Sequence, residues 1–316
     1  MADKYSNAGK YAKRQVKKQA KKHPAAFLVI LLIFALIAGG AYLLDSLGII
    51  NIFGNSTINR TSIAEGKAEL HFIDVGQGDC ALIRTSEGNI LIDCGPRDAK
   101  DAVLKYFSDN GIDKIKYAVF THPHEDHMGC AAEILEKIEV ENIIMPDAVS
   151  TAKYYEAALD VIEKKNINVI KAKSGDKYSL GGFDMTVISP NSEKYSNTNN
   201  YSVVILADFG DTSFMFTGDA EKLAEDEILK KYGNENLKCT LLKVGHHGSD
   251  TSTSESFLKA VSPEYAVISV GANNSYGHPC EETLLLLEKY NVKYYTTEKE
   301  GTIVFVSDGT KLERKQ

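Results

Sequence analysis

Six of the eight histidines in this 316-residue chain lie in three short motifs, each following an apolar stretch that is predicted to be a strand. The first motif is Thr121-His122-Pro123-His124-Glu125-Asp126-His127. Three histidines and two acids at this spacing repel one another or titrate together unless a cation compensates them. His122 and His124, two residues apart on an extended turn, can converge on one metal ion. Asp126 and His127, at the start of the next helix, can reach a second ion, so the motif predicts metal binding rather than a solvated polar loop.

An aspartate stands at the end of a later apolar strand. Asp219 follows Thr217-Gly218, and the glycine lets the backbone come close to a ligand. A carboxylate in this position can bridge two cations. An aspartate between a strand and a helix can instead be a helix N-cap, but in the company of the first motif we expect the bridging role.

The other three of these six histidines lie in two motifs near the C-terminal end. Gly245-His246-His247-Gly248 again follows an apolar strand. We expect His246 to be the metal ligand that follows Asp219 in the chain, and His247 to face the substrate or to hydrogen-bond to a metal ligand. The alternative is that His247 is the ligand and His246 has the other role. His278, within Tyr276-Gly277-His278-Pro279, could protonate a leaving group or bind substrate, or be a structural loop histidine. Asp126 could orient or deprotonate a water. Together with the two histidines that could act on the substrate, the expected catalytic residues are Asp126, His247 and His278.

The hydrophobic pattern predicts the elements that bring these motifs together. Strands are predicted over 69–75, 80–85, 89–93, 116–121, 142–145, 183–189, 201–208, 212–217, 238–244 and 265–270, and near residues 294 and 303. Helices are predicted over 98–108, 130–138, 151–164, 220–231, 254–260 and 281–290. This order indicates two sheets that pack face to face with helices outside. The sequence therefore predicts an α/β (α+β) fold, a four-layer αββα sandwich over residues 67–316.

The N-terminal part of the chain has a different composition. Residues 1–24 form a basic tail, and residues 25–44 hold no charge over 20 residues, the length that a helix needs to cross a bilayer. Because positive charge stays in the cytoplasm, we expect a single-pass membrane anchor with the catalytic body outside the membrane. Residues 45–66 have no helical stripe and are predicted to be a linker. Cleavage as a signal peptide, which would release a secreted protein, is the alternative.

The body of the chain is acidic. Residues 1–23 hold eight Lys or Arg residues and one Asp, so the remainder of a chain of net charge −7 carries −14. Basic side chains that neutralise phosphates provide most non-specific nucleic-acid affinity, so an acidic body argues against broad nucleic-acid binding. The five cysteines include no C-x-x-C pair, and they suggest neither a zinc ribbon nor a disulfide framework.

Six motifs together resemble those of the metallo-β-lactamase superfamily. They are Phe72-Ile73-Asp74-Val75-Gly76-Gln77-Gly78-Asp79, Leu91-Ile92-Asp93-Cys94-Gly95, His122-Pro123-His124-Glu125-Asp126-His127, Thr217-Gly218-Asp219, His246-His247-Gly248-Ser249 and Tyr276-Gly277-His278-Pro279. More narrowly, they look like the branch typified by the extracytoplasmic C-terminal domain of the DNA-uptake protein ComEC, over residues 67–310. The resemblance implies metal-dependent hydrolysis and points to DNA as a substrate.

The chain departs from the superfamily pattern at one ligand. No histidine occurs between His127 and His246, so the third histidine that usually precedes the bridging aspartate is missing. Asn199-Asn200-Tyr201-Ser202 stands in that region and is similar to the pattern that the ComEC-like branch carries there. Of two divalent ions, one would then be completed by water or an oxygen ligand, so that Mn²⁺ suits the site as well as Zn²⁺. The expected metal ligands are His122, His124, Asp126, His127, Asp219 and His246.

The chemistry that such a site predicts is hydrolysis of a phosphodiester by a metal-activated water. The substrates considered are DNA, a nucleotide and a cell-wall polymer, and the membrane is the partner expected for residues 25–44. One alternative is amide hydrolysis of the β-lactamase type. The other is a surface binding module that keeps the fold and has lost its activity.

Overall fold

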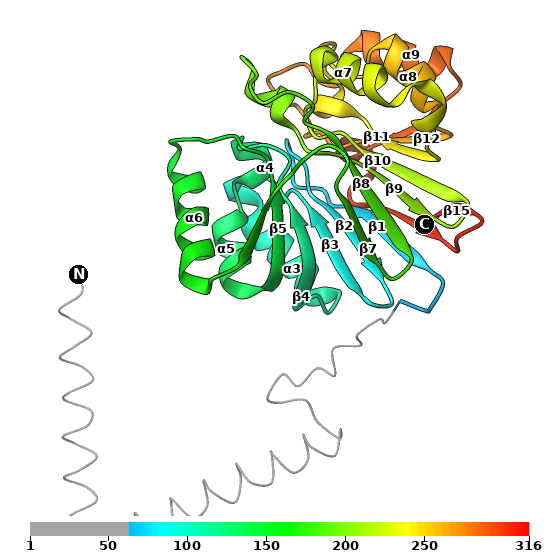
Figure 1. The fold of residues 1–316 in the computed structure, drawn as a ribbon. Coiled ribbons are helices and arrows are strands. Elements are labelled where there is room, and N and C mark those ends of the chain that lie inside the picture. The colour runs from blue at the N-terminus through cyan, green and yellow to red at the C-terminus, as the bar shows by residue number, and fades with distance from the viewer. Residues whose placement is uncertain (1–62, 316) are drawn as a thin grey trace, which may run out of the picture. The chain divides into compact units, whose positions relative to one another are not determined.

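The computed structural model describes residues 63–315, whose strands form two sheets (Figure 1). The order in the first sheet is β15 (Leu312–Lys315), β14 (Ile303–Ser307), β1 (Ala68–Phe72), β2 (Ala81–Thr85), β3 (Gly88–Ile92), β4 (Lys114–Val119), β5 (Glu139–Met145) and β6 (Asn168–Lys171). The order in the second is β13 (Lys293–Thr296), β12 (Tyr265–Ile268), β11 (Leu241–Lys243), β10 (Thr212–Phe216), β9 (Val204–Phe209), β8 (Phe183–Ser189) and β7 (Lys177–Leu180). In both sheets parallel pairs adjoin antiparallel ones.

Helices cover the outer face of each sheet (Figure 1). On the first sheet they are α3 (Lys100–Asp109), α5 (Ala131–Lys137) and α6 (Lys153–Lys165), and on the second α7 (Lys222–Tyr232), α8 (Glu255–Val261) and α9 (Glu281–Lys289). Short helical turns lie in the connections: η1 (Arg97–Ala99), α4 (Glu125–Met128), η2 (Thr198–Tyr201), η3 (Asn234–Asn236), η4 (Gly245–Gly248) and α10 (Thr297–Glu300).

The main apolar core lies between the two sheets. Ala81 and Ile83 of β2 point into it, whereas Leu82 between them packs with the helices on the outer face. Phe183 and Phe214 enter the same core from the second sheet, with stacked rings whose centroids are 5.4 Å apart. Full burial of one such side chain contributes about 1.5–3 kcal/mol to the free energy of unfolding. The four-layer αββα sandwich predicted from the sequence is therefore the one observed.

The structure differs from the predicted elements mainly where side chains are polar. The strand predicted over 201–208 begins only at Val204, because the Asn197 side chain accepts a hydrogen bond from the Asn199 amide and starts the η2 turn. The strand predicted over 238–244 is limited to β11. Three strands were not predicted, β6, β7 and β15, which lie at or next to sheet edges and carry mostly exposed or half-buried polar side chains without an apolar run.

The basic tail, the predicted anchor over 25–44 and most of the predicted linker lie outside the described residues. Within residues 63–315, no helix has both the length and the apolar character needed to cross a membrane. The first strand of the sandwich begins at Ala68. The membrane anchor therefore stays a prediction from sequence.

Candidate metal centre

The predicted site residues all follow the carboxyl end of a strand. His122 and His124 come after β4, Asp126 and His127 lie on α4, Asp219 follows β10, His246 and His247 form the middle of η4 after β11, and His278 follows β12. Because β10, β11 and β12 run parallel, their carboxyl ends meet at one edge of the second sheet. The face-to-face packing of the sheets then places the loop after β4 beside this edge.

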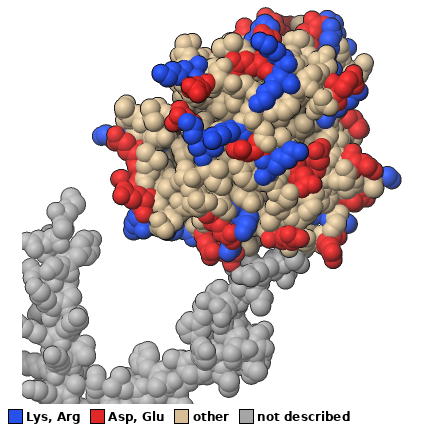
Figure 2. Space-filling model, in the orientation of Figure 1, with Lys and Arg blue, Asp and Glu red and all other residues tan. Residues whose placement is uncertain are grey.

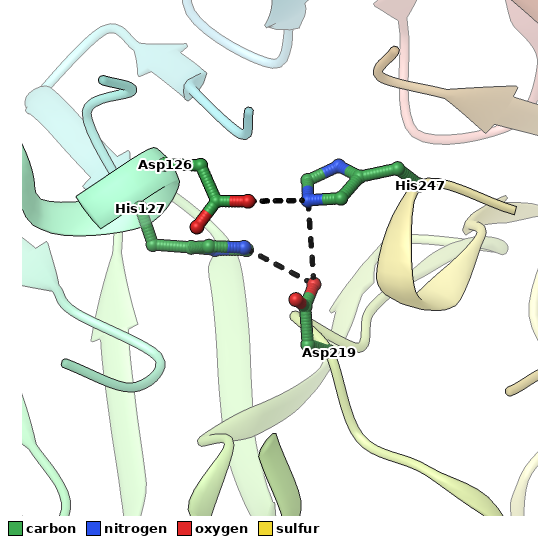
Figure 3. Close-up of side chains that lie close together, drawn as sticks. All are labelled: Asp126, His127, Asp219 and His247. Carbon is green, nitrogen blue, oxygen red and sulfur yellow. Dashed lines mark hydrogen bonds and ion pairs between the residues drawn. The ribbon is translucent and has the colours of Figure 1, made fainter. Parts of the chain in front are cut away.

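Four of these residues, Asp126, His127, Asp219 and His247, form a compact group that we call ligand group A (Figure 3). His127 Nε2 lies 3.1 Å from Asp219 Oδ1. His247 Nε2 lies 3.2 Å from Asp126 Oδ2 and 3.8 Å from Asp219 Oδ1. The group combines side chains from three separate loops, and all but Asp126 are buried.

A second set, His122, His124 and Asp219, is called ligand group B. His122 Nε2 and His124 Nδ1 are 3.0 Å apart, and His122 Nε2 lies 3.7 Å from Asp219 Oδ2. Group B thus uses one carboxylate oxygen of Asp219, while group A uses the other. Asp219 is the residue that the two groups share, which is the arrangement expected of a bridging ligand.

The unpaired atoms of the centre fit a divalent cation. Among the described residues, the buried atoms His127 Nε2 and Asp219 Oδ1 face each other as an ion pair but make no hydrogen bond of good geometry. Buried polar atoms without partners are costly, and a cation that accepts both lone pairs removes that cost. Imidazole nitrogens with carboxylate oxygens are ligands suited to Zn²⁺ and Mn²⁺.

The charges of group A are strongly coupled. Burial alone would lower the pKa of His247, but the Asp219 and Asp79 carboxylates and the bond to Asp126 raise it to about 10. The pKa of His127 is likewise raised well above its usual value, against burial, by Asp219, Asp93 and Asp126. Burial and the neighbouring His127 instead hold the pKa of His122 well below its usual value. Without a cation, the two acids of group A therefore keep protons on its histidines.

Asp93, which the sequence analysis did not single out as a site residue, holds His127 from behind. Its Oδ2 accepts hydrogen bonds from His127 Nδ1 and Thr121 Oγ1, both at 2.7 Å, and its Oδ1 accepts one from the Thr121 amide at 2.8 Å. A proton on His127 Nδ1 leaves Nε2 free to face Asp219, which is how carboxylates orient metal-binding histidines. The sequence signal that could have identified Asp93 is its position directly after an apolar strand, which is also the position of Asp219.

A buried ion pair stands behind His247 in the same way. Lys243 Nζ lies 2.8 Å from Asp79 Oδ2, and Asp79 Oδ1 lies 3.2 Å from His247 Nδ1, which also lies 2.9 Å from the Ser269 carbonyl oxygen. Burial would raise the pKa of Asp79, but the charges of Lys243 and His247 lower it to about 2. The sequence analysis did not single out Asp79 as a site residue. A lysine inside the apolar strand before His246 was the signal that a buried acid must lie nearby.

Comparison with known proteins agrees with this geometry. The sequence model of the Metallo-beta-lactamase superfamily matches residues 73–272. The chain belongs to the metallo-β-lactamase superfamily. The resemblance noted from the motifs is thereby confirmed, and members of this superfamily are generally metal-dependent hydrolases.

Curated relatives of this metallo-β-lactamase-fold chain include a ComE operon protein and a competence protein. ComE operon protein 3 of Bacillus subtilis is 30% identical over 257 residues, 76% of this chain and 33% of that protein. Competence protein ComA of Neisseria gonorrhoeae is 30% identical over 245 residues, 77% of this chain and 33% of that protein. The chain thus spans about a third of the length of these relatives. Among solved structures, the metallo-β-lactamase fold protein YhfI of Bacillus subtilis superposes with a TM-score of 0.54 at 13% identity, covering 76% of this chain and 100% of that one, which supports the fold.

Ser202 and Asn199 lie where the superfamily's third histidine is missing. Ser202 Oγ lies 3.4 Å from His122 Nδ1 and accepts a hydrogen bond from the Asp219 amide at 3.1 Å. Asn199 Nδ2 lies 3.5 Å from His246 Nε2. Ser202 thus positions a histidine and the shared aspartate, and group B consists of two histidines and that aspartate.

Of the two histidines of η4, only His247 belongs to a ligand group. His247 is buried in group A, whereas the half-buried His246 has Nε2 3.7 Å from Asp219 Oδ2 and Nδ1 3.0 Å from Thr251 Oγ1. Both adopt left-handed backbone angles, φ 50° for His246 and 54° for His247, which turn the rings to different sides. The geometry favours the alternative in which His247 is the ligand that follows Asp219 in the chain and His246 lies at the open side.

His278 lies at the outer rim beside His246. The ring centroids of His278 and His246 are 5.6 Å apart, and the exposed Tyr276 ring stacks near His278 at 5.8 Å. Burial lowers the pKa of His278, aided by the charges of His246 and His247. Its Nδ1 is buried and makes no hydrogen bond within the described residues. His278 is therefore close to the centre but belongs to neither ligand group.

Proposed function

We propose that this protein is a metal-dependent phosphodiesterase whose centre is built on ligand groups A and B. The observation that carries the proposal is Asp219, whose two oxygens are divided between the groups. Two divalent cations held there would supply an ionised water and stabilise the entering and leaving oxygens of an in-line displacement. Zn²⁺ and Mn²⁺ are the ions that the ligand set suits.

Residues around ligand groups A and B would bind and orient the substrate. Asp126 is 30% exposed and lines a cavity of about 750 Å³ that also includes Arg97, Lys100 and Tyr276. Arg97 and Lys100 can hold phosphate oxygens, although four acids line the same cavity, and one of these acids, Asp126, can orient the attacking water. His278, at the rim, can donate a hydrogen bond or a proton to the departing oxygen, a role for which the buried His247 is less suited.

DNA is the phosphodiester that the resemblance to the ComEC-like branch favours. A nucleotide and a cell-wall polymer have the same scissile chemistry and stay as candidates. In this proposal residues 25–44 anchor the chain in the membrane as a single span, with the domain on the outer side, and cleavage after that span would give a secreted form.

The test uses the full chain, purified in detergent and loaded with Mn²⁺ or Zn²⁺. We expect hydrolysis of bis-p-nitrophenyl phosphate, and we expect His124→Ala and Asp219→Ala to reduce kcat/KM by more than the roughly 100-fold that loss of a supporting residue costs. Hydrolysis of nitrocefin instead would indicate a β-lactamase. Bound metal without hydrolysis of any phosphodiester or of nitrocefin would indicate a binding module and would overturn the proposal.

A further inference from the structure

A second cavity has a volume of about 480 Å³. Its lining comes from the segment after β6, the connection that follows β8, η2 and the end of α7. It is rich in basic side chains, namely Lys171, Lys173, Lys194 and Lys231, against two acids, Asp147 and Glu193. Figure 2 shows that Lys and Arg side chains elsewhere on the surface lie among Asp and Glu side chains. In a domain whose overall charge is strongly negative, this cavity is a local positive site.

The four lysines differ in how they are held. Lys231 Nζ donates to Ser174 Oγ at 2.8 Å, and Lys171 Nζ pairs with Asp147 Oδ2 at 2.5 Å. Lys173 and Lys194 are exposed and form no ion pair within residues 63–315. Lys171 and Lys231 are thus held in place by their partners. Lys173 and Lys194 keep charges that no acid neutralises, and such charges can attract an anion.

Another lysine-containing cavity in the domain shows the contrast. There Lys114 Nζ lies 2.8 Å from both Glu139 Oε1 and Glu141 Oε1, and Lys116 pairs with Glu141. These lysines are neutralised by acids on the neighbouring strand. The charge of the first cavity is therefore not a general property of lysines on this surface.

A single helical turn, η2, separates the lysine-lined cavity from the metal centre. Tyr201 of η2 lines the cavity. Two residues earlier, Asn199 contacts His246, and the next residue, Ser202, lies 3.4 Å from His122 Nδ1. A chain molecule bound at the metal centre can therefore pass over η2 and reach the lysines.

We propose that this lysine-lined cavity binds phosphates that flank the scissile one, so that the substrate is a polymer of phosphodiesters rather than a small diester. The proposal rests on the proposed function. Lysines are point charges that hold phosphate oxygens of a backbone and do not read bases. The cavity thus supplies charge recognition that the acidic remainder of the domain lacks.

The experiment compares Lys173→Gln/Lys194→Gln with the matched variant Lys114→Gln/Lys116→Gln, in the full chain in detergent. Binding of a fluorescent single-stranded oligothymidylate is measured by anisotropy in a chelator, across a salt series. For the cavity variant we expect binding about tenfold weaker and a salt slope smaller by about 1.4, since each phosphate contact on a single strand contributes about 0.7. The matched variant should keep the affinity and slope of the natural chain.

Turnover separates this proposal from the proposed function. With metal bound, the cavity variant should show a raised KM for the oligothymidylate and unchanged hydrolysis of bis-p-nitrophenyl phosphate, which is too small to reach the lysines. Equal binding by both variants, or no binding by the natural chain, would overturn the cavity assignment even if the small diester is hydrolysed. If no diester is hydrolysed but the cavity variant still binds more weakly in chelator, the cavity stands and the proposed enzyme fails. The same binding measurement with poly(glycerol phosphate) in place of oligothymidylate shows which of the two phosphodiester polymers binds more tightly.

Discussion

Asp79 and Lys243 form an ion pair inside the domain, with 2.8 Å between Asp79 Oδ2 and Lys243 Nζ, and the same carboxylate lies beside His247. Both members are almost fully buried. A buried ion pair adds little stability in itself, but loss of one partner leaves an uncompensated charge. The pair therefore links the first turn of the domain to a histidine of ligand group A.

The first prediction concerns this pair. Lys243→Met should lower the free energy of unfolding by about 3 kcal/mol, because the Asp79 charge stays buried without its partner. Asp79→Asn should weaken metal binding about 10- to 100-fold, because the group that orients His247 loses its charge. Urea unfolding and competitive metal titration measure the two effects. Asp74→Asn is the control in the same turn, since Asp74 is exposed and its side chain accepts a hydrogen bond from the Gly76 amide, which an asparagine oxygen can also accept. Equal effects of both aspartate variants would contradict the prediction.

The second prediction distinguishes the two adjacent histidines. His247→Ala should lose one metal ion per chain, because His247 lies in ligand group A, whereas His246→Ala should keep its metal content. Metal analysis of the full chain after dialysis, with circular dichroism to check folding, is the measurement. The reverse result would restore the assignment expected from the sequence.

The third prediction concerns the turn that packs on Asp126. A Cβ atom at Gly78, whose φ is +151°, would lie 2.4 Å from the Asp126 carbonyl oxygen. Gly78→Ala should therefore displace α4, weaken metal binding and lower the free energy of unfolding by about 2 kcal/mol. Gly76→Ala is the control, because its Cβ meets no atom within 4 Å and only the backbone strain of φ +73° is added. If Gly76→Ala weakens metal binding as much as Gly78→Ala, contact with Asp126 is not the cause.

The fourth prediction concerns pH. Because the pKa of His247 is raised to about 10 in the metal-free fold, a metal ion that binds at neutral pH must displace its proton. The protonated histidine stabilises the metal-free fold fully below its unfolded pKa of about 6.5, and this stabilisation is lost as pH rises toward 10. Metal affinity should therefore increase with pH over that window.

Calorimetry tests this proton release. The heat of Zn²⁺ binding should depend on the ionisation enthalpy of the buffer, with one or more protons released per chain. His247→Ala should release fewer protons. A binding heat that is the same in two buffers of different ionisation enthalpy, neither of which binds Zn²⁺, would show that no proton leaves and that the histidines are already neutral.

The sequence by itself determined the layers of the fold and the local part of the centre. Strand alternation, as in Ala81, Leu82 and Ile83, follows from the two-residue period of a strand and requires no knowledge of neighbours. The ligand candidates from His122 to His127 were recognisable because they lie within six consecutive residues, whose spacing already limits which atoms can converge. The motif series also identified the superfamily that the comparison then confirmed.

Only the tertiary structure decided how distant residues are combined. His246 and His247 are equivalent in sequence, and it is the left-handed turn of η4 against β12 and α4 that places His247 in group A and leaves His246 at the rim. The roles of Asp79 and Asp93 arise in the same way, because each meets a histidine from another loop. The contact of Asp79 with His247 depends on the packing of one sheet on the other. Asp93 meets His127 because the neighbouring strands β3 and β4 run parallel and end at the same edge of the first sheet. Neither contact leaves a local signal in the segments that make it.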